Sequence, residues 1–133
     1  MDSLQIHHYG LATNNLQQSM DVFHSLGYSI GDIVIDPIQK VKLVFASRSG
    51  EPMIEMICDL DATGPTGKII AKSGNGFYHV CYEINDMEES IEKFRNRGFL
   101  LRHKPVVAAA FHGRKIAWMY NRFIGLVELL EKQ

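Results

Sequence analysis

The 133-residue sequence lacks several features that mark particular classes of protein. Its 2 cysteines, Cys58 and Cys81, form no CxxC pair and no disulfide framework, so we expect a reducing, cytoplasmic location. No apolar run approaches the length of a membrane span, and the polar start MDSLQIHH does not resemble a signal peptide. Lys and Arg number 14 against 15 Asp and Glu, which excludes nucleic-acid or membrane binding through a bulk positive field. What is present is an ordinary globular composition, 46% hydrophobic, with 6 histidines.

An internal repeat organises the chain. Residues 8–28 and 79–99 match without a gap at one constant offset (79 − 8 = 71). The identical pairs are His8/His79, Asn14/Asn85, Ser19/Ser90, Phe23/Phe94 and Gly27/Gly98. Chance gives roughly one or two identities in such a window, so the match indicates duplication. The sequence therefore predicts a single domain, 1–133, made of repeat modules 5–58 and 76–131 with a connector at 59–75.

Each module is expected to run strand, helix, strand, strand, strand. Polar residues at 13–15 and 85–86 supply N-caps for the two helices, and Gly27 and Gly98 end them. The connector holds a candidate short helix at 66–73. The expected strands are 6–12, 28–35, 41–47, 53–58, 77–84, 99–103, 115–120 and 126–130. Neither module can bury its sheet alone, so we expect the two halves to pair.

The repeat places two histidines and two glutamates at equivalent positions. His8 matches His79 early in the opening strands, and Glu55 matches Glu128 in the closing strands, at an offset of 73 (128 − 55 = 73). Each glutamate lies in a strand that is apolar on both faces, where an ionised carboxylate needs a cation or strong donors beside it. Two imidazoles and two carboxylates form a candidate site for a divalent transition metal with open positions for water or substrate. Structural hydrogen bonding is the alternative for these four residues.

The other histidines are weaker candidates for the metal site. His7 is adjacent to His8 and should point to the opposite face of its strand, so the repeat register selects His8. His112 aligns with Gln39 at the offset of 73, and the two could line the mouth of the site or be turn residues without a role. We expect His24 and His103 to face solvent.

Three segments, HHYGLATNNLQQSMDVFHSLGY, GFYHVCYEINDMEESIEKF and GRKIAWMYNRFIGLVELLE, resemble the vicinal oxygen chelate superfamily of glyoxalases, bleomycin-resistance proteins and dioxygenases. The resemblance covers most of the chain and is closest to methylmalonyl-CoA epimerase and glyoxalase-4 type members. It implies an α+β fold in which two tandem βαβββ modules form a partly open mixed β-barrel. It also implies a homodimer and a divalent ion (Co, Ni, Zn, Mn or Fe) held by the four residues named above, His8, Glu55, His79 and Glu128.

The function implied by this resemblance is a metal-dependent epimerase, isomerase or lyase. Such an enzyme removes a proton next to a thioester or ketone carbonyl, with the metal stabilising the enolate, and Glu128 is the favoured base. Glu55 either remains a ligand or acts as a base opposite Glu128. The implied small-molecule substrate is an acyl-CoA or a glutathione adduct. Its phosphates or carboxylates could meet a basic group that is otherwise a solvated surface: Arg95, Arg97, Arg102, Lys104, Arg114 and Lys115.

Three alternatives stay open at this point. One is a lactoylglutathione lyase, which the ligand set with Glu55 also fits. Another is a non-catalytic binding protein of the bleomycin-resistance type. The third, an extradiol dioxygenase, is weaker because those enzymes are commonly larger chains of several modules.

Overall fold

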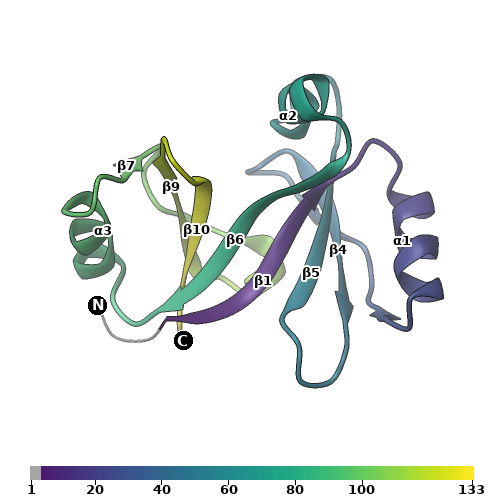
Figure 1. The fold of residues 1–133 in the computed structure, drawn as a ribbon, viewed down its shortest axis with the longest axis horizontal. Helices are drawn as coiled ribbons and strands as arrows, with labels where there is room; N and C mark the ends of the chain where they lie inside the picture. The colour runs from purple at the N-terminus through teal and green to yellow at the C-terminus, as the bar shows by residue number, and fades with distance from the viewer. Residues whose placement is uncertain (1–3) are drawn as a thin grey trace. The chain divides into compact units, whose positions relative to one another are not determined.

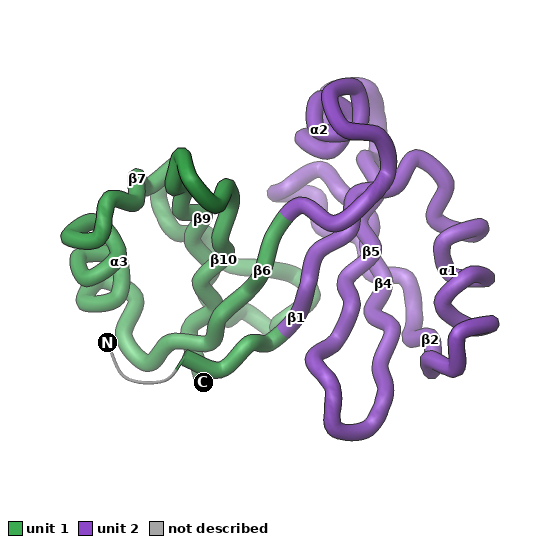
Figure 2. The backbone as a smooth tube through the Cα atoms, in the orientation of Figure 1, with its two compact units in different colours: residues 1–7, 79–133 green, residues 8–78 purple. Residues whose placement is uncertain are grey.

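The computed structural model describes residues 4–133, so residues 1–3 of the polar start lie outside the described residues. The chain divides into two compact units (Figure 2). Unit 2 comprises residues 8–78, and unit 1 comprises residues 79–133 together with the segment up to His7. The grouping of modules 5–58 and 76–131 into one domain stays a prediction.

Unit 2 is a mixed sheet with a helix packed on one face. From His8 onward, β1 runs parallel to β5, while β4 is antiparallel to β5, β2 and β3. The strand order is β2-β4-β5-β1, which makes β2 an edge strand. Figure 1 shows α1 alongside β4 and β5. The elements are β1 (Gln5–Ala12), α1 (Leu16–Ser25), β2 (Ser29–Ile30), β3 (Val34–Asp36), β4 (Val41–Ser47), β5 (Met53–Asp59) and α2 (Thr66–Ser73).

Unit 1 repeats this arrangement. From His79 onward, β6 runs parallel to β10, and β9 is antiparallel to β10, β7 and β8. The strand order is β6-β10-β9-β7, so β7 is the edge strand that corresponds to β2. The elements are β6 (Gly76–Ile84), α3 (Met87–Arg95), β7 (Leu100–Leu101), β8 (Val106–Val107), the 3-10 turn η1 (Ala109–Phe111), β9 (Lys115–Asn121) and β10 (Gly125–Glu131). The mixture of helices with parallel and antiparallel strands confirms the α+β class.

The two repeated helices begin and end as the sequence predicts. The Asn15 side chain accepts a hydrogen bond from the backbone N–H of Gln18, and the Asp86 side chain accepts one from Glu89. At the other end, Gly27 and Gly98 adopt φ of 95° and 88°. These left-handed residues turn the chain out of the helix at little steric cost because glycine has no Cβ.

The expected strands are found, with one systematic difference. The expected strand 28–35 is two short strands, β2 and β3, because the chain leaves the sheet after Gly31, whose N–H donates to the Phe45 carbonyl at 2.9 Å. The expected strand 99–103 is only β7, and β8 follows Pro105, which has no N–H to donate to a ladder. Each half thus contains one more strand than predicted. The connector helix is found at 66–73, as α2.

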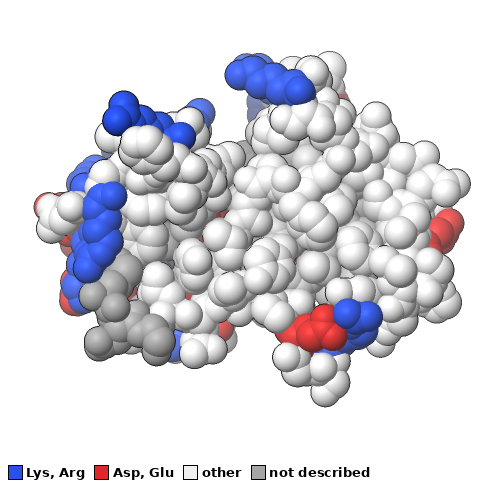
Figure 3. Space-filling view, viewed as in Figure 1, with Lys and Arg blue, Asp and Glu red and all other residues white. Residues whose placement is uncertain are grey.

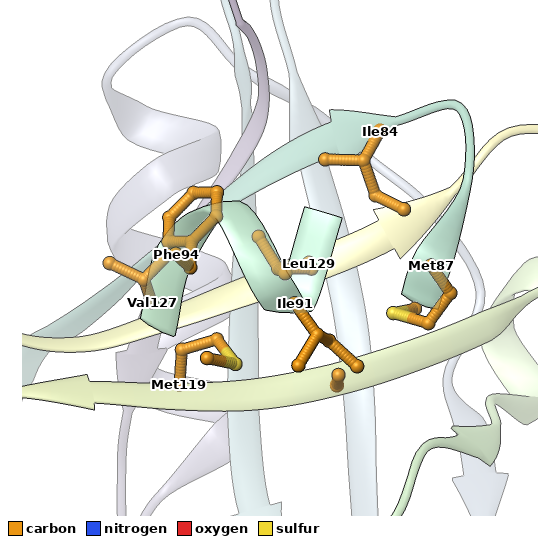
Figure 4. Packing of buried hydrophobic residues seen from close by; sticks show 8 residues of the cluster. Ile84, Met87, Ile91, Phe94, Met119, Val127 and Leu129 are labelled. Carbon is orange, nitrogen blue, oxygen red and sulfur yellow. The ribbon is translucent and has the colours of Figure 1, made fainter. Parts of the chain in front are cut away.

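In each unit the helix covers one face of the sheet, and apolar side chains fill the space between them. In unit 1, Ile91 and Phe94 of α3 lie against Met119, Val127 and Leu129 of β9 and β10 (Figure 4). In unit 2 the corresponding cluster is made of buried residues of α1, β4 and β5: Leu16, Val44, Ala46, Ile54 and Met56. Alternation along the strands therefore sends Glu55 and Glu128 to the opposite face of each sheet.

We call this opposite face the site face. In unit 2 it carries His8, Phe45 and Glu55, and in unit 1 it carries His79, Trp118 and Glu128. Among residues 4–133, no helix has the length and apolar character required to cross a membrane.

Candidate metal centre

Unit 2 holds a buried histidine–glutamate pair on its site face. His8 lies on β1 and is fully buried, and Glu55 on β5 is only 4% exposed. Their atoms Nε2 and Oε1 are 3.3 Å apart. The pairing of Gly10 with Glu55 in the parallel ladder makes His8 and Glu55 diagonal neighbours, so their side chains converge. Strand register alone therefore brings these two residues together.

Unit 1 holds the equivalent pair. His79 lies on β6 and Glu128 on β10, 5% and 2% exposed, and Nε2 and Oε1 are again 3.3 Å apart. Here Cys81 is the residue directly opposite Glu128 in the ladder, the position of Gly10 in unit 2. The repeat predicted from the sequence is thus seen in the side chains as well, since the histidine–glutamate distance is the same in both units.

An aromatic ring stands edge-on to each imidazole. Phe45 meets His8 with ring centroids 5.7 Å apart and planes at 72°, and Trp118 meets His79 at 4.7 Å and 86°. Each aromatic residue is also directly opposite the glutamate of its unit in the antiparallel ladder. Neither ring was among the predicted site residues, although Phe45 and Trp118 align at the same offset of 73 as the two glutamates (118 − 45 = 73). The rings restrict the imidazoles to one orientation.

Four aligned residues cross the site face of each unit from edge strand to opening strand. In unit 2 this row is Gly31, Phe45, Glu55 and Gly10. In unit 1 it is Arg102, Trp118, Glu128 and Cys81. The first two residues of the row are joined by the same backbone hydrogen bond in both units. The N–H of Gly31 donates to the Phe45 carbonyl, and the N–H of Arg102 donates to the Trp118 carbonyl, each at 2.9 Å. The inner two positions hold an aromatic residue and a glutamate in both units, while the outer two positions differ between the units.

The remaining candidates have local contacts of their own. His7 packs edge-on against Phe111, with centroids 5.2 Å apart. The Gln39 side-chain amide donates to the Asp36 carboxylate at 2.8 Å, within the turn after β3. His112 is exposed and adopts a left-handed φ of 53° directly after η1. A role for Gln39 or His112 at the mouth of a site stays a prediction.

The donor set suits a divalent transition metal. His8, Glu55, His79 and Glu128 are buried ligand-type residues that could hold an ion. Imidazole nitrogen and carboxylate oxygen are ligands of Zn, Co, Ni, Mn and Fe, and a set with only four protein donors leaves positions for other ligands on six-coordinate ions. The residues present therefore fit the kind of ion that the sequence analysis expected.

Comparison with known proteins identifies the family. The sequence model of the Glyoxalase/Bleomycin resistance protein/Dioxygenase superfamily matches residues 7–118, and the chain belongs to this superfamily. The resemblance inferred from the repeat and its motifs is confirmed.

Several of the similar proteins are methylmalonyl-CoA epimerases at low identity. The mitochondrial methylmalonyl-CoA epimerase of Dictyostelium discoideum is 25% identical over 136 residues, covering 96% of this chain and 78% of the relative. A crystal structure of a hypothetical protein from Bacillus halodurans C-125 matches with a TM-score of 0.87 and 26% identity, covering 99% and 96% of the two chains. A variant of the Streptomyces coelicolor methylmalonyl-CoA epimerase in complex with 2-nitronate-propionyl-CoA matches with a TM-score of 0.83 and 19% identity, covering 98% and 99%. These matches confirm the predicted fold.

Proposed function

We propose that this protein is a divalent-metal-dependent epimerase that acts on an acyl-CoA thioester. In this proposal His8, Glu55, His79 and Glu128 are the ligands of one ion, and Glu128 and Glu55 are the proton-transferring groups. Membership of the superfamily and the low-identity likeness to methylmalonyl-CoA epimerases support the reaction class.

The observation that carries the proposal is the geometry of the two pairs. A hydrogen bond between an imidazole N–H and a carboxylate is usually about 2.7–2.9 Å long. Two ligand atoms that each lie about 2.1 Å from the same ion are about 3.0–3.4 Å apart when the ligand–metal–ligand angle is between about 90° and 109°. The distance of 3.3 Å found in both units fits shared ligation better than a direct hydrogen bond. This favours a metal site over the structural alternative.

A bound divalent ion acts as a Lewis acid that stabilises negative charge on the carbonyl oxygen of the substrate. The glutamates would move the proton. A carboxylate beside the α-carbon takes the proton, and epimerisation requires its return to the opposite face. Glu128 and Glu55 occupy equivalent positions in the repeat, and two such carboxylates can supply one group for each face of the α-carbon. The buried setting keeps bulk water from competing for that proton.

The thioester substrate is proposed from the relatives. The Streptomyces coelicolor enzyme is described in complex with 2-nitronate-propionyl-CoA, and another methylmalonyl-CoA epimerase structure contains methylmalonyl-CoA. A homodimer likewise stays a proposal.

Metal content tests the first step of the proposal. Protein purified without chelator, or reloaded with Co²⁺ or Zn²⁺, should bind one divalent ion per chain, measured by elemental mass spectrometry. His8→Ala and His79→Ala should each remove that ion, because each unit supplies half of the donors. Two ions per chain, or loss of metal in only one of the two variants, would contradict a single four-ligand site.

Proton exchange tests the chemistry. In deuterated buffer the metal-loaded protein should exchange the α-proton of methylmalonyl-CoA, followed by NMR. Glu128→Gln should abolish exchange while the exposed control Glu88→Gln on α3 leaves it unchanged. Exchange with a glutathione hemithioacetal instead of the thioester would replace the epimerase proposal by the lyase. Full metal binding with no exchange of either substrate would favour a binding protein.

A further inference from the structure

Unit 1 has two arginines on its site face, and their surroundings differ. Arg114 precedes β9, donates from Nη2 to Glu83 Oε2 at 2.7 Å, and donates from Nε to the Glu131 carbonyl. Its charge is already neutralised within the unit. Arg102 follows the edge strand β7 and is exposed. Among residues 4–133, no carboxylate lies within ion-pair distance of the Arg102 guanidinium.

The sheet register fixes where Arg102 stands. Leu100 pairs with Tyr120 and Leu101 with Met119, and the Arg102 N–H donates to the Trp118 carbonyl at 2.9 Å. Opposed residues in an antiparallel ladder place their side chains on the same face. Arg102 therefore lies on the face that carries Trp118 and Glu128, in the row described above.

The guanidinium of Arg102 lies near one aromatic ring of this face. The Cζ atom lies 5.8 Å from the centre of the Tyr120 ring, within range of a cation–π contact. Because β9 alone separates Arg102, the residue after β7, from Glu128 on β10, the two backbones are about 10 Å apart. Lys and Arg side chains are visible on the α3 and β7 side of unit 1 (Figure 3), but Lys93 and Arg95 of α3 are paired with Glu89 and Glu92. The equivalent position in unit 2 is Gly31, which offers no charge.

We propose that Arg102 is an anion-binding specificity residue that receives an oxyanion of the substrate, a phosphate or a carboxylate, at the edge of unit 1's site face. The planar guanidinium can donate two hydrogen bonds to either group. It is free to bind an anion because, among residues 4–133, no carboxylate forms an ion pair with it. The proposal builds on the proposed function, since the bound molecule is the same thioester or adduct. Arg102 serves recognition and takes no part in proton transfer.

Binding measured by calorimetry tests this assignment separately from catalysis. The probes are coenzyme A, which offers phosphates, and S-methylglutathione, which offers carboxylates. Arg102→Gln should weaken binding of one probe about tenfold or more, the usual effect of losing a charge-assisted hydrogen bond. Arg102→Lys should recover part of the affinity. Arg95→Gln, an exposed arginine of α3 with the same loss of charge, should bind as tightly as the wild type. The probe that responds identifies the oxyanion.

Three results would overturn the assignment: wild-type protein that binds neither probe, Arg102→Gln binding both as tightly as wild type, or an equal loss in Arg95→Gln. Metal content is measured on the same samples. Arg102→Gln should keep the full ion content, since Arg102 is no ligand. If the wild type binds no metal but its affinity for a probe depends on Arg102, the proposed enzyme is wrong and the Arg102 assignment stands. If the wild type binds metal and exchanges the α-proton but its affinity for the probes does not depend on Arg102, the proposed function stands and the Arg102 assignment is wrong.

Discussion

The indole ring of Trp118 stands edge-on to the imidazole of His79, with centroids 4.7 Å apart and planes at 86°. Phe45 holds the same relation to His8 in the other unit. If the imidazoles are metal ligands, as proposed, contacts of this kind would orient them in advance, so that less ordering would be needed when an ion binds. Both rings lie opposite a glutamate in the ladder, so one aromatic side chain orients the imidazole and borders the carboxylate.

Loss of this ring should weaken metal binding without removing a ligand. Trp118→Ala should lower the affinity for Zn²⁺ about tenfold or more, measured by competition with a chromophoric chelator, because His79 gains rotational freedom. Trp118→Phe keeps a ring beside His79 and should stay within a few-fold of the wild type. Circular dichroism of both variants checks that the fold is retained. An affinity unchanged in Trp118→Ala would show that the ring does not orient the ligand.

The core between α3 and its sheet should dominate the stability of unit 1. Leu129 is fully buried among Ile91, Phe94 and Met119. Leu129→Ala should cost about 2–5 kcal/mol of unfolding free energy in a urea titration, because it removes buried methyl groups and leaves a cavity. Leu100→Ala is the matched control: Leu100 is 67% exposed, and its truncation should cost less than about 0.5 kcal/mol. Similar losses in the two variants would contradict the packing described here.

The helix-terminal glycines should be far more sensitive to alanine than a glycine in ordinary backbone. Gly27 has φ of 95°, so an added Cβ is strained even though no atom lies within 4 Å of it. Gly27→Ala should destabilise the protein by about 1 kcal/mol. Gly76→Ala, where no positive φ is needed and the space is equally open, should be close to neutral. Both are read from urea midpoints, and equal effects would mean that conformation at the helix end is not the cause.

The Arg48–Glu51 pair should contribute to stability in a pH-dependent way. Hydrogen bonds from the Arg48 guanidinium at 2.9 Å lower the pKa of the Glu51 carboxyl below its ordinary 4.5. A carboxyl whose pKa is lower in the folded state stabilises the fold above its unfolded pKa and loses that contribution as the pH falls through the folded value. The wild type should therefore exceed Glu51→Gln in urea midpoint near neutral pH, with the gap closing below about pH 4. A gap that is constant down to pH 3 would exclude this ionisation as its source. The effect should be small, because both side chains are exposed.

Much of this architecture could be predicted from the sequence because the repeat doubles each signal. The N-caps at Asn15 and Asp86 and the glycines at the helix ends follow from local rules that act within a few residues. The constant offset selects His8 of the His7–His8 dipeptide, and His8 is the histidine that lies beside Glu55.

What could not be predicted depends on contacts between distant strands. The break of strand 28–35 into β2 and β3 arises where Gly31 bonds to Phe45, and no local signal distinguishes it from a continuous strand. The aromatic partners of the imidazoles follow from ladder register, which single-residue patterns do not specify. Sequence patterns do not separate Arg102 from Arg114, and only the structure shows that Arg114 is paired with Glu83.

The row of four aligned residues on each site face ends in Gly31 in unit 2 and in Arg102 in unit 1, so the two copies differ at the margin of the sheet. Its interior, a glutamate beside an aromatic ring, is common to both copies, while the position at the sheet margin has diverged completely. Under the two proposals made above, the interior residues would carry the chemistry and the marginal residue would carry recognition. Substitution of the marginal residue alone would then change which molecules bind and leave the proposed reaction intact.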